Sequence, residues 1–397
     1  MAEYKMVRLG DVCEIQSGGT PSRSKTEYWK DGTIPWVKIG DFSGKYLDKT
    51  TEHITQQGLD NSSAKLFSKG TILYSIFATL GEATILNIDA TTNQAIAGIK
   101  IKDKSSVDID YFYSFLKSLK DEVNRIGRGV AQNNINLSIL KSFFIPLPPL
   151  ETQKQIAAQL DKCTAVIAKH KQMLEKYDTL IKSRFIEMFG DPVQNPMGWE
   201  VKKLGKMCSA IMNGTTPKGG EQVYVENGIT FLRSQNVWRN KIDLDDVAYI
   251  DEATHKSMKK SSLKKYDILI TKTGRINTEN SSLGRAALFL GEDDSANING
   301  HVYLIRLEKE YNHEFVIRIL TSPEYRDYIR SICVGGIDKR QVNKDHIDEF
   351  PIIQPPKELQ DEYSTFVQQI DKSKFAVQKS LEKAETLYKS LMQLYFA

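Results

Sequence analysis

Two long stretches of the chain carry their mainly apolar positions at alternating intervals of four and three residues. The first runs from Ile156 to Met188 and the second from Tyr363 to Tyr395, and the two registers coincide at an offset of 207 (363 − 156 = 207). This spacing is typical of a coiled-coil seam. The first stretch contains no Gly or Pro before Gly190. We expect two long helices that pair antiparallel within one chain, the alternative being two amphipathic helices that each lie on a separate globule.

Short apolar runs bounded by Gly, Asp and Asn come before each long helix, as is typical of β-strands. In the first half they lie at residues 34–39, 71–75, 95–101 and 143–145, with apolar residues at helical spacing over 111–120. The second half repeats this order with strands at 229–233, 268–271 and 302–307 and a helix at 315–320. The pattern predicts an α+β protein with two globules of mixed α/β structure.

The sequence letters repeat together with the pattern. Residues 148–153 read PPLETQ and residues 355–360 read PPKELQ, an offset of 207 (355 − 148 = 207), whereas Leu9-Gly10 precedes Leu204-Gly205 by 195 (204 − 9 = 195). The drift indicates insertions in loops of the second copy. One of them lies within residues 272–285, which are longer than their counterpart 75–82. We expect an internal duplication with a first globule at 1–148, a first spacer helix at 149–190, a second globule at 191–355 and a second spacer helix at 356–397.

Composition narrows the class of protein only slightly. The chain has 54 Lys and Arg against 50 Asp and Glu, a formal charge of +4, so nucleic acid is permitted as a partner but not required. Its four cysteines are widely spread without a C-x-x-C pair, which favours free thiols. No stretch approaches about 18 apolar residues and the N-terminus has no apolar signal core, so we expect a cytoplasmic protein without a membrane segment.

The motifs of the most relevant enzymes are absent from the sequence. It has no G-x-x-x-x-G-K-S/T phosphate loop and no N/D-P-P-F/Y tetrapeptide of adenine methyltransferases, and its six histidines lack metal-ligand spacing. No pair of carboxylates stands out for nuclease chemistry. The inventory favours binding over catalysis, with no metal site.

Side chains suited to DNA contact recur at matching places in the two globules. Residues 125–134 combine arginine, glutamine and asparagine with two glycines and no acid, and residues 335–343 are their counterpart. Guanidinium and amide groups can bridge two atoms of a base edge, whereas lysines suit phosphates. For each segment the alternative is an ordinary solvated loop. The candidate DNA-binding residues are Lys38, Gln94, Arg125, Arg128, Gln132 and Asn133 in the first globule, and Arg233, Lys260, Lys272, Arg275, Arg285, His301, Lys339, Arg340 and Gln341 in the second.

Four motifs carry a resemblance to a known family. They are IPLPPLETQ at 145–153, KGTIL at 69–73, GGTP at 18–21 and NQA at 93–95, although the second copy departs from the last with NGH at 299–301. With these motifs the chain resembles, over almost its whole length, the specificity (S) subunit of Type I restriction–modification enzymes. The resemblance implies two target-recognition globules that read a bipartite sequence in double-stranded DNA, one half-site each, and helices that set the gap between them.

The same resemblance implies partner subunits and assigns the catalytic steps and cofactors to those partners. Methyltransferase (M) subunits, two in number, would dock on the helices, and restriction/translocase (R) subunits would join through them. S-adenosylmethionine, ATP and Mg would belong to those partners, with no cofactor in this non-catalytic chain. Two rival hypotheses are a self-sufficient restriction or methylation enzyme, against which the missing motifs argue, and a scaffold that binds methyltransferase subunits without reading sequence.

Overall fold

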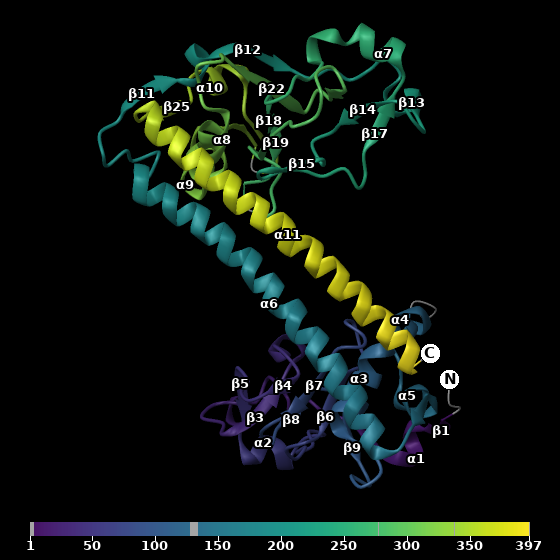
Figure 1. Cartoon of the computed structure of the whole chain (residues 1–397). Helices are drawn as coiled ribbons and strands as arrows, with labels where there is room; N and C mark the ends of the chain where they lie inside the picture. The colour runs from purple at the N-terminus through teal and green to yellow at the C-terminus, as the bar shows by residue number, and fades with distance from the viewer. Residues whose placement is uncertain (1–3, 128–133, 277, 337, 397) are drawn as a thin grey trace. The chain divides into compact units, whose positions relative to one another are not determined.

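The computed structural model describes residues 4–127, 134–276, 278–336 and 338–396 (Figure 1). The chain forms two compact units: unit 1 comprises residues 1–172 and 377–397, and unit 2 comprises residues 173–376. Each unit has its own sheets and its own main hydrophobic core. Both long helices contribute one part to unit 1 and the other part to unit 2, so the division by contacts runs through the segments that the sequence predicts as separate spacers.

Unit 1 is built on a five-stranded sheet in the order β2-β9-β6-β7-β4, beside a three-stranded sheet in the order β5-β3-β8. Successive residues of β6 point to opposite faces of the sheet and belong to two hydrophobic cores. Ile72 and Tyr74 pack with helix α3 (Ile109–Ser118), whereas Leu73 packs with Val37 of β3. The strands are β2 (Cys13–Ser17), β3 (Ile34–Val37), β4 (Tyr46–Leu47), β5 (Glu52–Ile54), β6 (Ile72–Ser75), β7 (Ala83–Leu86), β8 (Thr91–Thr92) and β9 (Ile96–Ile101).

The helices of unit 1 cover the first of these cores. Helix α3 begins after Asp108, whose side chain accepts hydrogen bonds from the amides of residues 110 and 111. A two-stranded pairing of β1 (Lys5–Arg8) with β10 (Phe144–Leu147) closes the globule by joining its first segment to its last. The helices are α1 (Leu9–Val12), α2 (Gln56–Asp60), α3 (Ile109–Ser118), α4 (Lys120–Gly127) and α5 (Leu137–Ser142).

Unit 2 repeats this architecture in the same order along the chain. Its sheets run β12-β22-β18-β20 and β13-β17-β14-β21, and β11 pairs with β25 as β1 does with β10. The elements are β11 (Glu200–Lys203), β12 (Cys208–Asn213), β13 (Tyr224–Val225), β14 (Ile229–Leu232), β17 (Ala248–Ile250), α7 (Glu252–Ser257), β18 (Ile268–Thr271), β20 (Ala286–Leu288), β21 (Ala296–Ile298), β22 (Val302–Leu307), α8 (His313–Thr321), α9 (Pro323–Ile332), α10 (Lys344–Asp348) and β25 (Pro351–Gln354). The predicted α+β class and internal duplication are confirmed.

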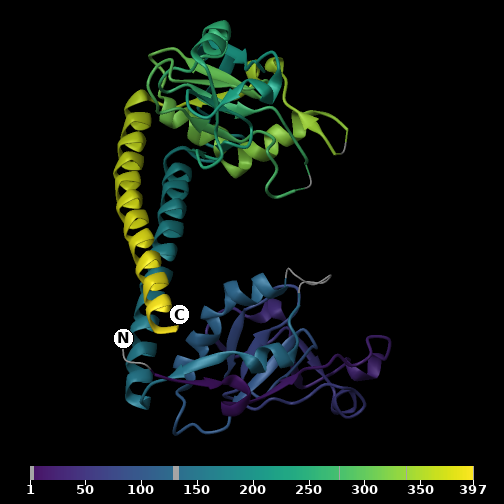
Figure 2. The ribbon, with the colours of Figure 1, turned by 90° about the vertical axis from the view of Figure 1, so that its right-hand side faces the viewer.

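Unit 2 also contains two small ribbons. A hairpin joins β15 (Val237–Trp238) to β16 (Lys241–Ile242), and a three-stranded sheet has the order β19-β24-β23, with β19 at Thr273–Gly274, β23 at Val334–Gly335 and β24 at Arg340–Gln341. In Figure 2 the yellow-green strands β23 and β24 extend away from the body of unit 2. The strand β19 lies in the long connection that the sequence comparison identifies as an insertion.

The long helices α6 (Leu150–Phe189) and α11 (Lys357–Phe396) pair antiparallel. In unit 1 Lys171 forms an ion pair with Glu385 at 2.9 Å, and in unit 2 Arg184 forms one with Glu362, also at 2.9 Å. All the predicted seam positions on both helices are buried or half-buried. The heptad prediction is confirmed, and the alternative of two separate helices is wrong.

Gln153 explains why the PPLETQ stretch is recognisable in the sequence. Its side chain is fully buried; its oxygen accepts from the Asp108 amide at 2.9 Å, and its nitrogen donates to the carbonyls of Ser106 and Pro148. One side chain thus ties the first turn of α6 to the loop that enters α3. In the second copy Gln360 donates to the Pro355 carbonyl at 2.8 Å, which matches the Pro148 contact.

Candidate nucleic-acid interface

Three loops meet at the end of the central strand in each unit. In unit 1 the Ile76 amide donates to the Ala95 carbonyl at 2.9 Å, and the Ile76 carbonyl accepts from the Ile135 amide at 3.0 Å. In unit 2 Lys272 makes the same two bonds, to His301 at 2.8 Å and from Val342 at 2.9 Å. The loop after β6 or β18, the loop before β9 or β22 and the segment before α5 or α10 therefore converge. We call this meeting point the loop junction.

A repeated turn shapes one side of the loop junction. The Asn93 side chain accepts from the Ala95 amide at 3.0 Å, and the Asn299 side chain accepts from the His301 amide at 3.1 Å. The glycine-rich loop after the first strand of each sheet packs tightly on this turn, since a Cβ at Gly18 would lie 2.3 Å from the Thr92 carbonyl oxygen. The GGTP and NQA motifs are thus two sides of one backbone contact.

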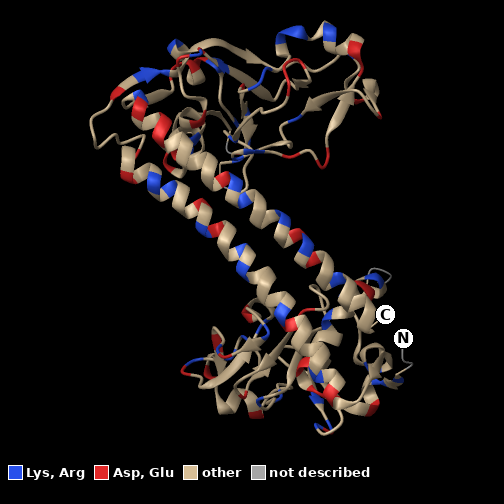
Figure 3. Ribbon diagram, in the orientation of Figure 1, with Lys and Arg blue, Asp and Glu red and all other residues tan. Residues whose placement is uncertain are grey.

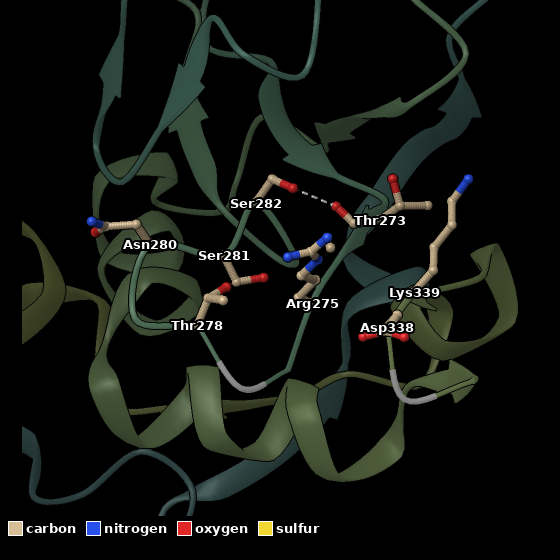
Figure 4. A pocket seen from close by; sticks show the side chains of 9 residues that line it. Thr273, Arg275, Thr278, Asn280, Ser281, Ser282, Asp338 and Lys339 are labelled. Carbon is tan, nitrogen blue, oxygen red and sulfur yellow. Dashed lines mark hydrogen bonds between the residues drawn. The ribbon is translucent and has the colours of Figure 1, made fainter. Parts of the chain in front are cut away.

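In unit 2 the loop junction opens into a polar cavity of about 300 Å³. Figure 4 shows the hydroxyl, amide and charged side chains around it, with the Ser282 hydroxyl donating to the Thr273 carbonyl at 2.7 Å. These groups can donate and accept hydrogen bonds in the way base edges require. The lining residues are Thr273, Gly274, Arg275, Thr278, Asn280, Ser281, Ser282, Asp338 and Lys339.

Most predicted residues of unit 2 gather here. Arg275 and Lys339 line the cavity, and His301 is exposed at the loop junction. Gln341 pairs with Thr273 across β24 and β19. Arg340 is half-buried and donates to the Cys333 carbonyl at 3.1 Å, so its side chain supports the ribbon.

Lys272 is half-buried at the junction itself. Its ammonium group lies 5.5 Å from the centre of the Tyr303 ring, a cation–π contact. The charge of Lys272 therefore lies over a ring of β22, the strand that follows His301.

Arg285 is buried, so it does not project into a groove from its loop. Its side chain is only 8% exposed, its Nε donates to the Ser281 carbonyl at 3.0 Å, and its guanidinium lies 3.8 Å from the centre of the Trp238 ring. Because the side chain turns inward from the loop, it cannot reach a base edge in a groove. Trp238 itself is 39% exposed.

Lys38 and Arg233 occupy equivalent positions, directly after β3 and β14, but both form ion pairs with nearby carboxylates. Lys38 forms an ion pair with Glu52 at 2.5 Å, and Arg233 forms one with Asp246 at 3.0 Å. The bond from Lys38, against the opposing effect of burial, holds the pKa of Glu52 below its usual value. Strand pairing brings these carboxylates in, which makes both cations poor candidates for base contacts.

The other predicted residues of unit 1 are only partly described. Gln94 is exposed and accepts from the Thr20 hydroxyl at 2.6 Å, and Arg125 is 80% exposed, 3.9 Å from Glu122. Arg128, Gln132 and Asn133 lie outside the described residues. The segment that follows them returns to the loop junction through Ile135.

Lys260 lies apart from the junction of unit 2. It is exposed on the short 3-10 turn over residues 259–261, and the next residues meet the start of β21 where the Leu263 amide donates to Ala296. His301 instead comes after the end of β21. The structure therefore does not bring Lys260 together with the cavity.

Among the described residues no group of His, Cys, Asp and Glu could hold a metal ion, and no described helix is long and apolar enough to cross a membrane. All four cysteines are free, as predicted. Burial raises the pKa of the Cys13 and Cys208 thiols to about 12, and both donate to a carbonyl four residues earlier.

The family model for the Type I restriction modification DNA specificity domain matches residues 1–176 and 196–385, so the chain belongs to this family and carries the domain twice. The MjaIX specificity subunit of Methanocaldococcus jannaschii is 28% identical over 293 residues, 68% of this chain and 66% of that subunit. The MjaVIII specificity subunit of the same organism is 23% identical over 99% of this chain and 92% of its own length. The EcoR124I/EcoR124II specificity subunit of Escherichia coli is 28% identical, with 40% of this chain and 41% of that subunit covered.

Solved structures show the same fold. The S subunit of a Type I restriction–modification system from M. genitalium aligns with a TM-score of 0.60 at 15% identity, covering 99% of this chain and 96% of that one. A second solved chain, from work on complex assembly and conformational transition of the type I R-M system, aligns with a TM-score of 0.58 at 16% identity. The match to the family model confirms the resemblance seen in the sequence, and these alignments show the same fold.

Proposed function

We propose that the chain is the DNA-sequence-specificity subunit of a Type I restriction–modification system and reads a bipartite target, one half-site per unit. The observation that supports this most is the loop junction, which has the same backbone bonds in both units but different side chains. Ile76 in unit 1 corresponds to Lys272 in unit 2, and Ala95 corresponds to His301. A common frame with exchanged side chains is suited to recognising two different sequences.

Within unit 2 the polar cavity is the proposed base-reading surface. Arg275 can bridge two acceptors of guanine, and Asn280 can pair with a donor and an acceptor of adenine. Lys339 is better suited to a phosphate, because an ammonium is a point charge without the planar fork of arginine. In unit 1 the corresponding surface includes Gln94 beside Thr20.

We infer that the helix pair sets the gap between the half-sites. Each helix has 40 residues, which corresponds to about 60 Å at ~1.5 Å per residue. Basic and acidic residues alternate along both helices (Figure 3), so they do not form a continuous basic stripe for DNA. A rod of mixed charge is suited to spacing and to contact with other proteins.

The exposed apolar side chains of the helices support docking of methyltransferase subunits. Val166, Met173 and Leu180 recur every seven residues on α6 and are 43–45% exposed. Leu387 and Leu394 hold the same heptad position on α11, with Leu387 at the repeat offset from Leu180 (387 − 180 = 207). Two related apolar stripes are consistent with two copies of one partner.

The remaining roles follow as proposals. The chain is non-catalytic and works in the cytoplasm, and its methyltransferase partners supply S-adenosylmethionine. The R subunits supply ATP, Mg and cleavage. The missing methylation and phosphate-loop motifs support this division of labour.

The proposal can be tested by determining which DNA sequence is methylated in a host that expresses this chain together with its methyltransferase. Arg275→Ala should relax one base position of one half-site, at about 1–3 kcal/mol, because it removes a fork from the cavity. Lys309→Gln is the matched control, an exposed cation beyond the opposite end of β22 from His301. If the complex and the methyltransferase alone shifted the same DNA equally, the chain would be a scaffold and the proposal would fail.

A further inference from the structure

Four arginines of unit 2 converge on the backbone of one loop. Arg239 and Arg326 both donate to the Glu279 carbonyl, and Arg330 donates to the Thr278 carbonyl at 3.3 Å. Arg285 donates to the carbonyls of residues 280 and 281. The loop over residues 278–281 is therefore held by guanidinium groups from the β15–β16 hairpin, from α9 and from its own end.

Among the residues that the structure describes, three of these arginines have no carboxylate within ion-pair distance. Arg330 lies 3.5 Å from Asp327, but in the described part of the chain no carboxylate lies within 4.0 Å of Arg239, Arg285 or Arg326. Burial and the neighbouring charge of Arg239 lower the pKa of Arg285, and burial with Arg239 and Arg330 lowers that of Arg326. The nearby carboxylates of Asp327 and Glu279 oppose this lowering for Arg326. Backbone carbonyls satisfy the donors of Arg239 and Arg285 but carry no full negative charge to balance them.

Two of these arginines, Arg239 and Arg285, line a cavity of about 370 Å³. The lining includes Arg285 and, from the hairpin, the exposed residues Arg239 and Lys241, with Asp243 as its only acid. Asp243 is 4.0 Å from Lys241. Trp238 and Asn280 complete the lining, which we call the arginine cavity.

Unit 1 shows what a compensated version of this place looks like. Glu82 is the counterpart of Arg285, since the Ser75 amide donates to the Glu82 carbonyl and the Thr271 amide to that of Arg285. Glu82 pairs with Lys117 at 2.8 Å and with Lys120 at 2.5 Å. In unit 2 the charge at this position has the opposite sign. The described helices around Arg285 do not place a carboxylate within ion-pair distance of it, whereas Lys117 and Lys120 pair with Glu82 in unit 1. Stability of the folded unit alone would therefore not explain an arginine without a carboxylate partner at this position.

We propose that the arginine cavity binds a backbone phosphate of the DNA whose bases are read at the neighbouring polar cavity. The loop over residues 278–281 is the wall between the two, because Asn280 lines both. One face offers hydroxyl, amide and guanidinium groups for base edges, and the other offers cations for a phosphate. The inference rests on the proposed function and adds to it a separate phosphate anchor in unit 2.

The first experiment uses the whole chain without DNA. Inorganic pyrophosphate, compared with chloride at the same ionic strength, should raise the unfolding temperature of the wild type because it binds the folded state. The shift should be lost in Arg239→Gln and Lys241→Gln and kept in Lys309→Gln. These positions are exposed, so the variants should fold, unlike changes at the buried Arg285. An equal shift in all four proteins would be a general salt effect and would overturn the proposal.

The second experiment uses the complex with methyltransferase and DNA that carries its methylated motif. Arg239→Gln and Lys241→Gln should each reduce the slope of log Kd against log salt by about 0.9. Lys241→Gln, whose side chain does not hold the loop over residues 278–281, should also leave the motif unaltered. Replacing single phosphates of the unit 2 half-site by neutral methylphosphonates should weaken wild-type binding at one position and have no further effect in Arg239→Gln. An unchanged slope together with pyrophosphate binding would mean a free-anion site and would overturn the phosphate assignment. Loss of all sequence preference in the wild-type complex would instead contradict the proposed function.

Discussion

The connection that follows the central strand, β6 in unit 1 and β18 in unit 2, differs more between the two units than the sheets do. In unit 1 residues 76–82 join β6 to β7, and in unit 2 residues 272–285 join β18 to β20. The longer connection adds β19 and lines two cavities, while the bonds that anchor both ends of the connection are kept. The difference shows that the duplicated frame tolerates change in length and in charge where the loop leaves the sheet.

A second contrast concerns how each globule is tied to the long helices. In unit 1 the loop residue Lys45 bridges Asp110 of α3 to Asp161 of α6, at 2.9 and 2.6 Å. In unit 2 Arg318 of α8 bridges Glu314 of its own helix to Asp371 of α11. Each globule uses one cation between two carboxylates, but it takes the cation from a different element. Both units therefore link the globule to a long helix by an ion-pair bridge, but they use different residues to do so.

The largest expected effect comes from lengthening both helices together. Insertion of one heptad after Lys171 in α6 and one before Glu385 in α11 keeps the seam in register, because these residues already pair. Seven residues add about 10 Å at ~1.5 Å each, or roughly three base pairs at ~3.4 Å per pair. The methylated motif should keep both half-sites and gain a longer gap. An active complex with an unchanged gap would show that the helices do not set the spacing.

A large effect on stability is expected at the aromatic contact between globule and helix in unit 2. Phe189 is fully buried, with its ring centre 4.9 Å from that of Phe315, so Phe189→Ala should lower the free energy of unfolding by about 3–5 kcal/mol. Its counterpart Phe396 is half-buried, 5.2 Å from Tyr111, and Phe396→Ala should cost about 1–2 kcal/mol. Urea unfolding of the two variants checks the order. Equal losses of unfolding free energy in the two variants would mean that burial does not determine how much each aromatic contact stabilises its unit.

A smaller effect is expected when the charge contrast of the two loops is removed. Glu82→Arg places a third cation beside Lys117 and Lys120 and should lower the free energy of unfolding by about 2 kcal/mol, since the site is partly buried. Glu82→Gln, which removes the charge without reversing it, should cost about half as much. Urea unfolding again gives the comparison. Wild-type stability in Glu82→Arg would show that unit 1 does not depend on this balance.

Periodicity allowed much of the fold to be predicted. The seam positions of α6 and α11 follow from apolar spacing along one chain segment, and β6 and β18 follow from short apolar runs that are buried throughout. The pairing of β1 with β10 could not be predicted in the same way, because it joins residues about as far apart as the globule is long. Strands of two residues, such as β8, leave no period to detect.

The sequence allowed the position of the candidate site to be predicted, but not which of its charged side chains form ion pairs. Matching polar segments and a longer loop in the second copy identified the loops that meet at Ile76 and Lys272. The sequence did not indicate that Lys38 and Arg233 are paired, since their acids come from other strands and loops. The arginines of the β15–β16 hairpin and α9 were missed, although the change from Glu82 to Arg285 was a visible signal.

The most direct test of one half-site per unit is a globule exchange read out by methylome sequencing. Residues 1–148 would be replaced by the corresponding globule of a related specificity subunit, and the chimera would be expressed with the methyltransferase of this chain. The account predicts a methylated motif in which one half changes while the other half and the gap length stay as in the wild type. A change in both halves would contradict independent reading by the two units, and an unchanged motif would show that unit 1 reads no sequence.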